Sequence, residues 1–146
     1  MKNRMTLTFD SRSENESLAR VTVSGFMAPL DPTMEEMMDV KTVVSEAVTN
    51  AIIHGYDSED GKDIELHCAY ENDELVIVIS DNGSGIEDVE MAKEPLYTSK
   101  PELERSGMGF TIMENFMDHV LVTSSPGNGT RVELRKKMVA KDRVCH

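Results

Sequence analysis

Leu75-Val76-Ile77-Val78-Ile79-Ser80-Asp81-Asn82-Gly83-Ser84-Gly85 is the stretch around which this chain is organised. It begins with the longest uninterrupted apolar run in the sequence, which predicts a buried central β-strand. The carboxylate of Asp81 then stands beside Gly83 and Gly85, whose bare backbone lets a flat, polar ligand approach closely. Because Asp-Asn-Gly is also a common turn sequence, this stretch alone favours a simple turn, and a binding site needs support from other segments.

The length and charge of the chain restrict its function. Its 146 residues fit one domain, residues 1–146, with no room for a separate substrate or sensor domain. The net charge of -12 argues against direct binding of nucleic acid or an anionic membrane and fits a basic protein partner or a metal-neutralised phosphate ligand. The sequence has no signal-peptide core, and Cys68 and Cys145 form neither a metal spacing nor a disulfide framework. We therefore expect a cytoplasmic protein.

The N-terminal part predicts an edge strand followed by a helix. Alternating apolar residues over Met5–Phe9 are typical of a half-buried strand, and an unpaired edge there is able to recruit a second copy, giving a homodimer. From residue 13 to about 27, the apolar residues suit the packed side of a helix, and Glu16 and Arg20 are among those turned outward. The apolar residues are Leu18, Val21, Val23 and Phe26. This outer face is either solvated or a partner surface, and Glu16 and Arg20 are the candidate partner contacts.

The second helix is the best defined element. Thr33 and Glu36 form a capping box that starts it, and Gly55 is the predicted C-cap. The predicted buried stripe consists of Met34, Met37, Met38, Val44, Val48, Ala51 and Ile52. Glu46, Asn50 and His54 are four residues apart, so a helix stacks them on one face, where Glu46 and Asn50 border the apolar side.

The remaining segments complete a sandwich of two layers. A hairpin joins a strand over residues 64–70 to the apolar run, and a long connection at about 87–106 suits a functional lid. A helix opening at Gly107 precedes two closing strands, at 120–124 and 131–135, and a charged tail at about 137–146. The fold class is therefore an α/β (α+β) two-layer sandwich, with a mixed, mainly antiparallel sheet and helices on one face.

Three separated segments share one chemical logic. The glycines Gly107 and Gly109 at a helix N-terminus offer free N–H groups and the positive end of the helix dipole to a phosphate. Asn50 has an amide oxygen suited to Mg²⁺, which takes few protein ligands beside phosphate oxygens and water. Glu46, one turn away, is placed to accept a proton from an incoming hydroxyl. Together with Asp81, these residues predict a nucleotide site.

Four motifs make the resemblance to a family specific. They occur in family order and are Glu46-Ala-Val-Thr-Asn50-Ala, Asp81-Asn-Gly83-Ser-Gly85, Gly107-Met108-Gly109-Phe110 and Gly127-Asn-Gly129-Thr130. They resemble the N box and the glycine boxes of the ATPase superfamily that contains gyrase, Hsp90, histidine kinases and MutL. The resemblance implies the Bergerat-type ATP-binding fold, with ATP or ADP and Mg²⁺ as cofactors.

The resemblance also implies roles for individual residues. Asp81 would hydrogen-bond the adenine amino group, with Thr130 supporting the base through water, while Gly83 and Gly85 let the nucleotide lie against the backbone. Asn50 would ligate magnesium, and Glu46 would be the general base. The residues expected to surround the phosphates are Gly107, Met108, Gly109 and Phe110. Lys100 or Arg105, both from the lid, would neutralise the terminal phosphate.

Within that superfamily, a chain of this length resembles the bacterial anti-sigma factor and serine-protein kinase group of spore-forming bacilli. The resemblance implies a serine/threonine protein kinase that inhibits a sporulation sigma factor and phosphorylates an anti-anti-sigma factor on serine. An alternative is an ATP-gated protein-binding switch without phosphoryl transfer. A third reading is a detached histidine-kinase domain acting in trans, which would give an acid-labile product.

Overall fold

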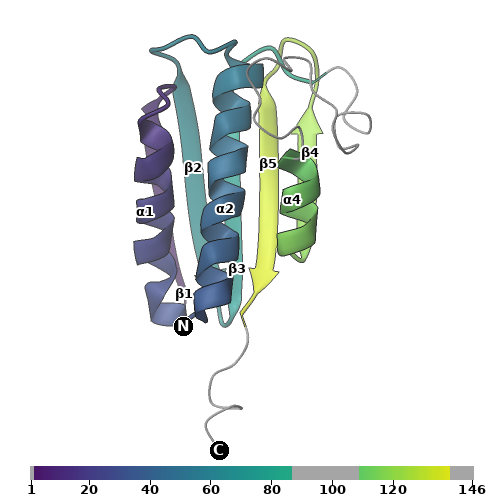
Figure 1. Ribbon diagram of the computed structural model, residues 1–146. Helices are drawn as coiled ribbons and strands as arrows, with labels where there is room; N and C mark the ends of the chain where they lie inside the picture. The colour runs from purple at the N-terminus through teal and green to yellow at the C-terminus, as the bar shows by residue number, and fades with distance from the viewer. Residues whose placement is uncertain (1, 87–108, 139–146) are drawn as a thin grey trace, which may run out of the picture.

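One five-stranded sheet and three α-helices make up the described part of the chain (Figure 1). The structure is a computed structural model that describes residues 2–86 and 109–138. The strands are β1 (Lys2–Asp10), β2 (Asp63–Glu71), β3 (Glu74–Asp81), β4 (His119–Ser124) and β5 (Thr130–Lys137). The helices are α1 (Asn15–Met27), the 3-10 turn η1 (Ala28–Leu30), α2 (Met34–Asn50), the π turn η2 (Ala51–Gly55) and α4 (Gly109–Phe116).

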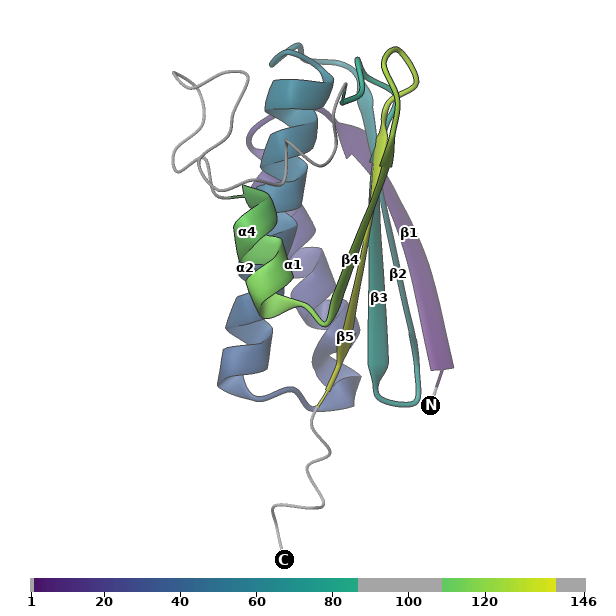
Figure 2. The same cartoon turned by 90° about the vertical axis from the view of Figure 1, so that its right-hand side faces the viewer.

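The two-layer prediction is confirmed, because the helices cover one face of the sheet and leave the other face open (Figure 2). The strand order is β1-β2-β3-β5-β4, which places β3 at the centre and β1 at an edge, as predicted. Each pairing between the described strands is antiparallel, so the parallel pair that a mixed sheet would contain is absent there. On β3, Leu75, Ile77 and Ile79 are buried beneath the helices, and Val78, on the other face, is 7% exposed, so this strand is apolar on both faces.

The predicted capping box is present at the start of α2. The hydroxyl of Thr33 accepts the N–H of Glu36 at 3.0 Å, and the carboxylate of Glu36 accepts the N–H of Thr33 at 2.8 Å. The predicted C-cap is wrong, because α2 passes into the π turn η2 and Gly55 lies within that turn, without a left-handed backbone. Such wide turns are rare in proteins, and those that occur are often found at functional sites.

The buried faces of both long helices agree with the prediction in part. In α1 the predicted Val23 is buried, in a ridge with Ala19 and Met27, while Leu18 and Val21 are 45% and 67% exposed. At about 100° per residue, Val21 lies nearly opposite that ridge. The same geometry turns Glu16 inward, so its side chain is 16% exposed.

For α2 the predicted Val44 and Val48 are buried, as are Ala51 and Ile52 in the turn that follows, but Met34 and Met38 are not. The buried ridge of the helix consists of Val40, Val43, Val44, Ala47 and Val48. Met34 and Met38 are 81% and 62% exposed, because they lie roughly a third of a turn away from the centre of that ridge. The helical period allowed either face, and the sheet packs against the narrower valine and alanine ridge.

Several predicted features lie outside the described residues: the lid at 87–106 with Lys100 and Arg105, the glycine-box residues Gly107 and Met108, and the tail beyond residue 138. Cys68 is buried on β2, and burial raises the pKa of its thiol to about 12, so it is a packing residue. Within the described segments, no helix is long and apolar enough to cross a membrane.

Candidate functional site

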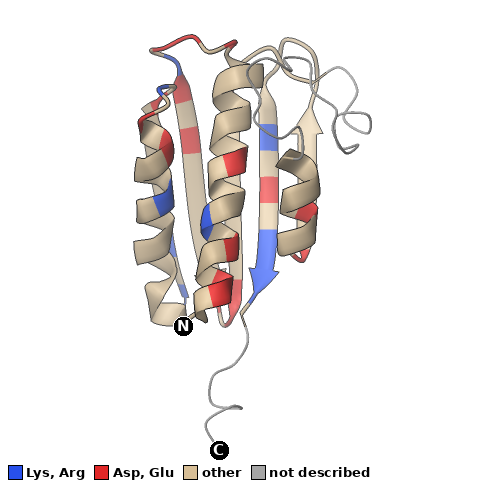
Figure 3. Ribbon diagram, in the orientation of Figure 1, with Lys and Arg blue, Asp and Glu red and all other residues tan. Residues whose placement is uncertain are grey.

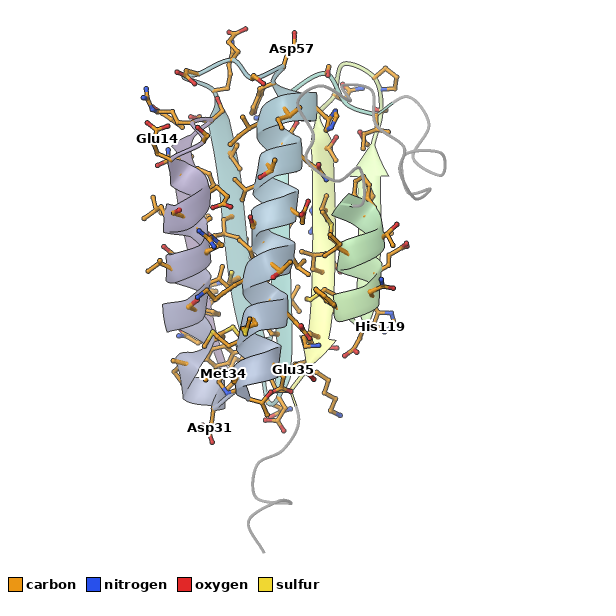
Figure 4. The ribbon with its side chains drawn as sticks, in the orientation of Figure 1. Glu14, Asp31, Met34, Glu35, Asp57 and His119 are labelled. Atoms are coloured by element: carbon orange, nitrogen blue, oxygen red, sulfur yellow. The ribbon has the colours of Figure 1, made fainter. Side chains whose placement is uncertain are left out.

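The predicted site residues that the structure describes gather at one end of the sandwich. The C-terminal ends of α2 and β3, the N-terminal end of α4 and the β4–β5 turn all meet there (Figure 1). In Figure 4, Asp57 marks this end, whereas Met34 and Glu35 lie at the opposite end of α2. The two-layer fold therefore brings segments that are far apart in the sequence to one edge.

Asp81 is a buried carboxylate at the end of the central strand. It is the last residue of β3, is 7% exposed and is the cross-strand partner of Thr130. Its Oδ1 accepts the N–H of Gly83 at 2.9 Å, and the backbone N–H of Thr130 also bonds to the carboxylate. Burial raises the pKa of Asp81, and these two hydrogen bonds partly offset that effect. The structure thus brings Asp81 and Thr130 together.

The glycines around Asp81 are required because backbone segments pass unusually close to one another. A Cβ on Gly83 would lie 1.9 Å from the carbonyl oxygen of Gly55, and one on Gly129 would lie 2.1 Å from the carbonyl oxygen of Asp81. A Cβ on Gly85 would likewise lie 2.0 Å from the carbonyl oxygen of Ser125. These contacts explain the glycines by packing within the protein, and their approach to a nucleotide stays a prediction.

Ser124 was not singled out from the sequence, yet it joins two of the glycine segments. Its Oγ accepts the N–H of Ile86 at 2.7 Å, donates to the carbonyl of Gly129 at 2.9 Å and lies 2.9 Å from the hydroxyl oxygen of Thr130. A serine at the end of an alternating strand carries no sequence signal for such a role. Its hydroxyl holds the first glycine segment against the start of β5.

Glu46 and Asn50 lie where α4 begins. A Cβ on Gly109 would lie 3.0 Å from Nδ2 of Asn50 and 3.4 Å from Oε2 of Glu46, so the first residue of α4 rests on these two side chains. Phe110 then packs against the core. The positive end of the α4 dipole is next to the carboxylate of Glu46 and the amide of Asn50. The helix end favours an anion, and the oxygen atoms of the two side chains favour a cation bound beside that anion.

The donors in this region fit a magnesium ion better than a metal held by the protein alone. The described residues contain no cluster of three or more histidine, cysteine, aspartate or glutamate side chains able to hold a metal. An asparagine oxygen beside a phosphate-binding helix end is the sparse ligand set that Mg²⁺ accepts, since its other ligands are phosphate oxygens and water.

The candidate partner residues lie on α1, facing α2. Contrary to the prediction, Glu16 is turned inward, where its carboxylate accepts a hydrogen bond from the hydroxyl of Ser45 and lies 3.1 Å from Nε of Arg20. Arg20 is more exposed, at 39%, and its Nη2 donates to the hydroxyl of Ser17 at 3.2 Å. Figure 3 shows acidic and basic positions next to each other on α1.

Comparison with known proteins shows the family of this chain. The model of the histidine kinase-like ATPase domain matches residues 9–136. An anti-sigma F factor of Halalkalibacterium halodurans is 56% identical over 146 residues, which is 100% of both chains. The chain belongs to the anti-sigma F factor family of histidine kinase-like ATPases. An ATPase domain of this type implies binding of ATP or ADP.

Other relatives support the same assignment, and one solved structure has the same fold. An anti-sigma F factor of Oceanobacillus iheyensis is 59% identical over 138 residues, 94% of each chain, and one of Geobacillus stearothermophilus is 54% identical over 146 residues, 100% of each. The crystal structure of RsbU and RsbW domains from Mycobacterium tuberculosis matches with a TM-score of 0.67 at 16% identity. The match covers 93% of this chain and 32% of that one, and it shows the fold alone.

The buried carboxylate gives a prediction that separates stability from binding. The pKa of Asp81 is higher in the folded state than in the unfolded state. Between these two pKa values the folded protein therefore keeps a proton on Asp81 that the unfolded chain has lost. Folding stability therefore falls across that interval, and above it the ionised carboxylate carries its full cost. Asp81→Asn should be as stable as wild type or more stable at pH 7, while ATP affinity falls about 10- to 100-fold.

Urea unfolding at pH 5 and 7, together with calorimetric titration of ATP, measures both effects. Asp73→Asn, in the exposed β2–β3 turn, is the control that should change neither. A variant at Asp81 that binds ATP normally and unfolds more easily at pH 7 would contradict the prediction.

Proposed function

We propose that this chain binds and inhibits a sporulation sigma factor and, as an ATP-dependent protein-serine kinase, phosphorylates and inactivates its anti-anti-sigma factor. Membership of the anti-sigma F factor family supports the first activity. The observation that carries the second is the contact of Gly109, at the start of α4, with Glu46 and Asn50, at the same end of the fold as Asp81.

The base of the nucleotide would be bound at Asp81. A carboxylate that accepts two hydrogen bonds keeps further lone-pair sites, and one of these is available to the adenine amino group. The pairing of Asp81 with Thr130 across β3 and β5 supports a role of Thr130 beside the base, through a water molecule.

The phosphates would lie between the α4 N-terminus and α2. Asn50 would hold Mg²⁺, which supplies charge neutralisation at the phosphate oxygens when bound. Gly107, Met108, Gly109 and Phe110 would enclose the phosphates, and Lys100 and Arg105 would add positive charge at the terminal phosphate. For the lid residues the proposal rests on the family motif.

Glu46 would act as the general base. It lies one helical turn before Asn50, so both side chains reach the same side of the terminal phosphate. The carboxylate of Glu46 takes the proton of the partner's serine hydroxyl while the serine oxygen bonds to the γ-phosphorus. The bond from that phosphorus to the bridging oxygen breaks, and ADP leaves.

Substitution of Glu46 tests the kinase activity. With Mg²⁺ and ATP labelled on the terminal phosphate, wild type should give acid-stable label on a serine of the anti-anti-sigma factor. Glu46→Gln should lower the rate about 10²- to 10⁴-fold, the contribution of a positioned base, and change ATP affinity no more than about twofold. Glu35→Gln, at the opposite end of the same helix (Figure 4), is the matched control and should transfer normally.

Two other outcomes would each indicate a different activity of this chain. ATP binding without transfer, together with an intact partner cycle in Glu46→Gln, would favour the ATP-gated switch. An acid-labile product would instead show phosphorylation of histidine.

The partner surface would include the Glu16–Arg20 pair. Ser45 and Ser17 hold the two side chains in place, so little side-chain entropy is lost when a partner binds Arg20. Ser45 directly precedes Glu46 on α2, so its hydrogen bond to Glu16 joins this surface on α1 to the helix that carries the proposed base.

Charge reversal on α1 tests that surface. Arg20→Glu sets a second carboxylate beside Glu16 and should weaken sigma-factor binding at least about tenfold, the usual effect of losing an important interface arginine. Arg12→Glu is the control, because it changes the charge by the same amount at a residue that lies before α1. Arg12 is 50% exposed and pairs with Glu14 and Asp60. Equal affinity of both variants, measured by calorimetry, would remove Arg20 from the interface.

A homodimer formed through β1 is part of the proposal. This strand is nine residues long and lies at the edge of the sheet, which suits pairing with a second copy. Light scattering of the free chain should give twice the mass of 16.3 kDa, and the mass of a monomer would remove the dimer.

A further inference from the structure

Tyr56 follows the π turn and is 9% exposed. Its hydroxyl accepts the N–H of Asn82 at 2.6 Å and donates to the carbonyl of Asp63 at 2.6 Å. Burial raises the pKa of Tyr56 above its usual value, so the hydroxyl keeps the proton that it donates. One side chain thus links the end of the α2–η2 segment to the residue after Asp81 and to the start of β2.

The neighbouring residue Gly55 holds the same loop from the other side. Its carbonyl accepts the N–H of Ser84 at 2.9 Å. A Cβ at Gly55 would lie 2.8 Å from all three carboxyl atoms of Asp81, so the carboxylate rests directly on this glycine. The segment after α2 is therefore in contact with Asp81 and hydrogen-bonded to the residues beyond it.

Three successive N–H groups of this loop each have a defined acceptor. Asn82 bonds to the hydroxyl of Tyr56, Gly83 to the carboxylate of Asp81, and Ser84 to the carbonyl of Gly55. Two of these acceptors belong to residues 55 and 56. Because Gly83 bonds directly to Asp81, any movement of the loop backbone changes the direction of that carboxylate.

We propose that Tyr56 is a positioning residue that directs the Asp81 carboxylate and so sets the preference of the site for a 6-aminopurine. The inference rests on the proposed function, in which Asp81 accepts the adenine amino group. Loss of the hydroxyl leaves the N–H of Asn82 and the carbonyl of Asp63 without this partner, and the loop shifts to satisfy them. Hydrogen bonds weaken steeply with misalignment, so a small shift reduces discrimination.

The test is the ratio of affinities for ATP and for purine riboside triphosphate, which lacks only the 6-amino group. Wild type should prefer ATP about tenfold or more, as expected for a hydrogen bond to a charged acceptor. In Tyr56→Phe that preference should fall at least about threefold, while the affinity for the analogue changes less than about twofold. Tyr70→Phe is the control, because Tyr70 is equally buried in β2 against Phe26.

The ratio separates positioning from general stability. If Tyr56 had a purely structural role, Tyr56→Phe would weaken the binding of ATP and of the analogue equally. The ratio of the two affinities would then be unchanged, which would overturn the inference. If Asp81→Asn loses the preference and Tyr56→Phe keeps it, the inference fails and the proposed base site stands. If wild type itself shows no preference, or Asp81→Asn keeps it, both fail.

Amide hydrogen exchange of the unmodified protein provides a test that does not depend on the folding of a variant. The Asn82 and Ser84 amides should be protected in the absence of nucleotide, because Tyr56 and Gly55 already bind them. Exchange of Asn82 at the rate of an open loop would overturn the inference.

Discussion

The structure depends on one constraint: a carboxylate is buried at the end of the central strand, against Gly55, and accepts two backbone N–H groups. Asp81 touches Gly55, and the backbone approaches at Gly83 and Gly129 leave no room for a Cβ. Packing at this distance ties three segments to the carboxylate. Because burial disfavours its ionised form, the arrangement costs folding free energy and indicates a function for the charge.

The two ends of α2 illustrate how the molecule separates stability from function. The end near Thr33 is fixed by a reciprocal capping box, and the middle is fixed by a ridge of valines. The other end runs into a π turn and carries Glu46, Asn50, Gly55 and Tyr56 within about three turns. A regular helix there would place Gly55 and Tyr56 in a different register relative to the end of β3.

The sequence predicted the features that depend on local pattern. The apolar run of β3, the alternation of β2 and the capping box at Thr33 each follow from short-range rules, and all are present. The exposure of Met34 and Met38 did not follow, because they were assigned to the same helical stripe as Val44 and Val48, and tertiary packing decides which part of that stripe is buried. Ser124 and Tyr56 were missed because their roles consist of hydrogen bonds between segments far apart in the sequence.

A crystal structure of the chain with Mg²⁺ and a non-hydrolysable ATP analogue tests the central claim most directly. We expect the adenine amino nitrogen within about 3.2 Å of an Asp81 carboxylate oxygen. We also expect Mg²⁺ about 2.1 Å from the amide oxygen of Asn50, with the γ-phosphate near Glu46. A base directed away from Asp81, or a metal held without Asn50, would contradict it.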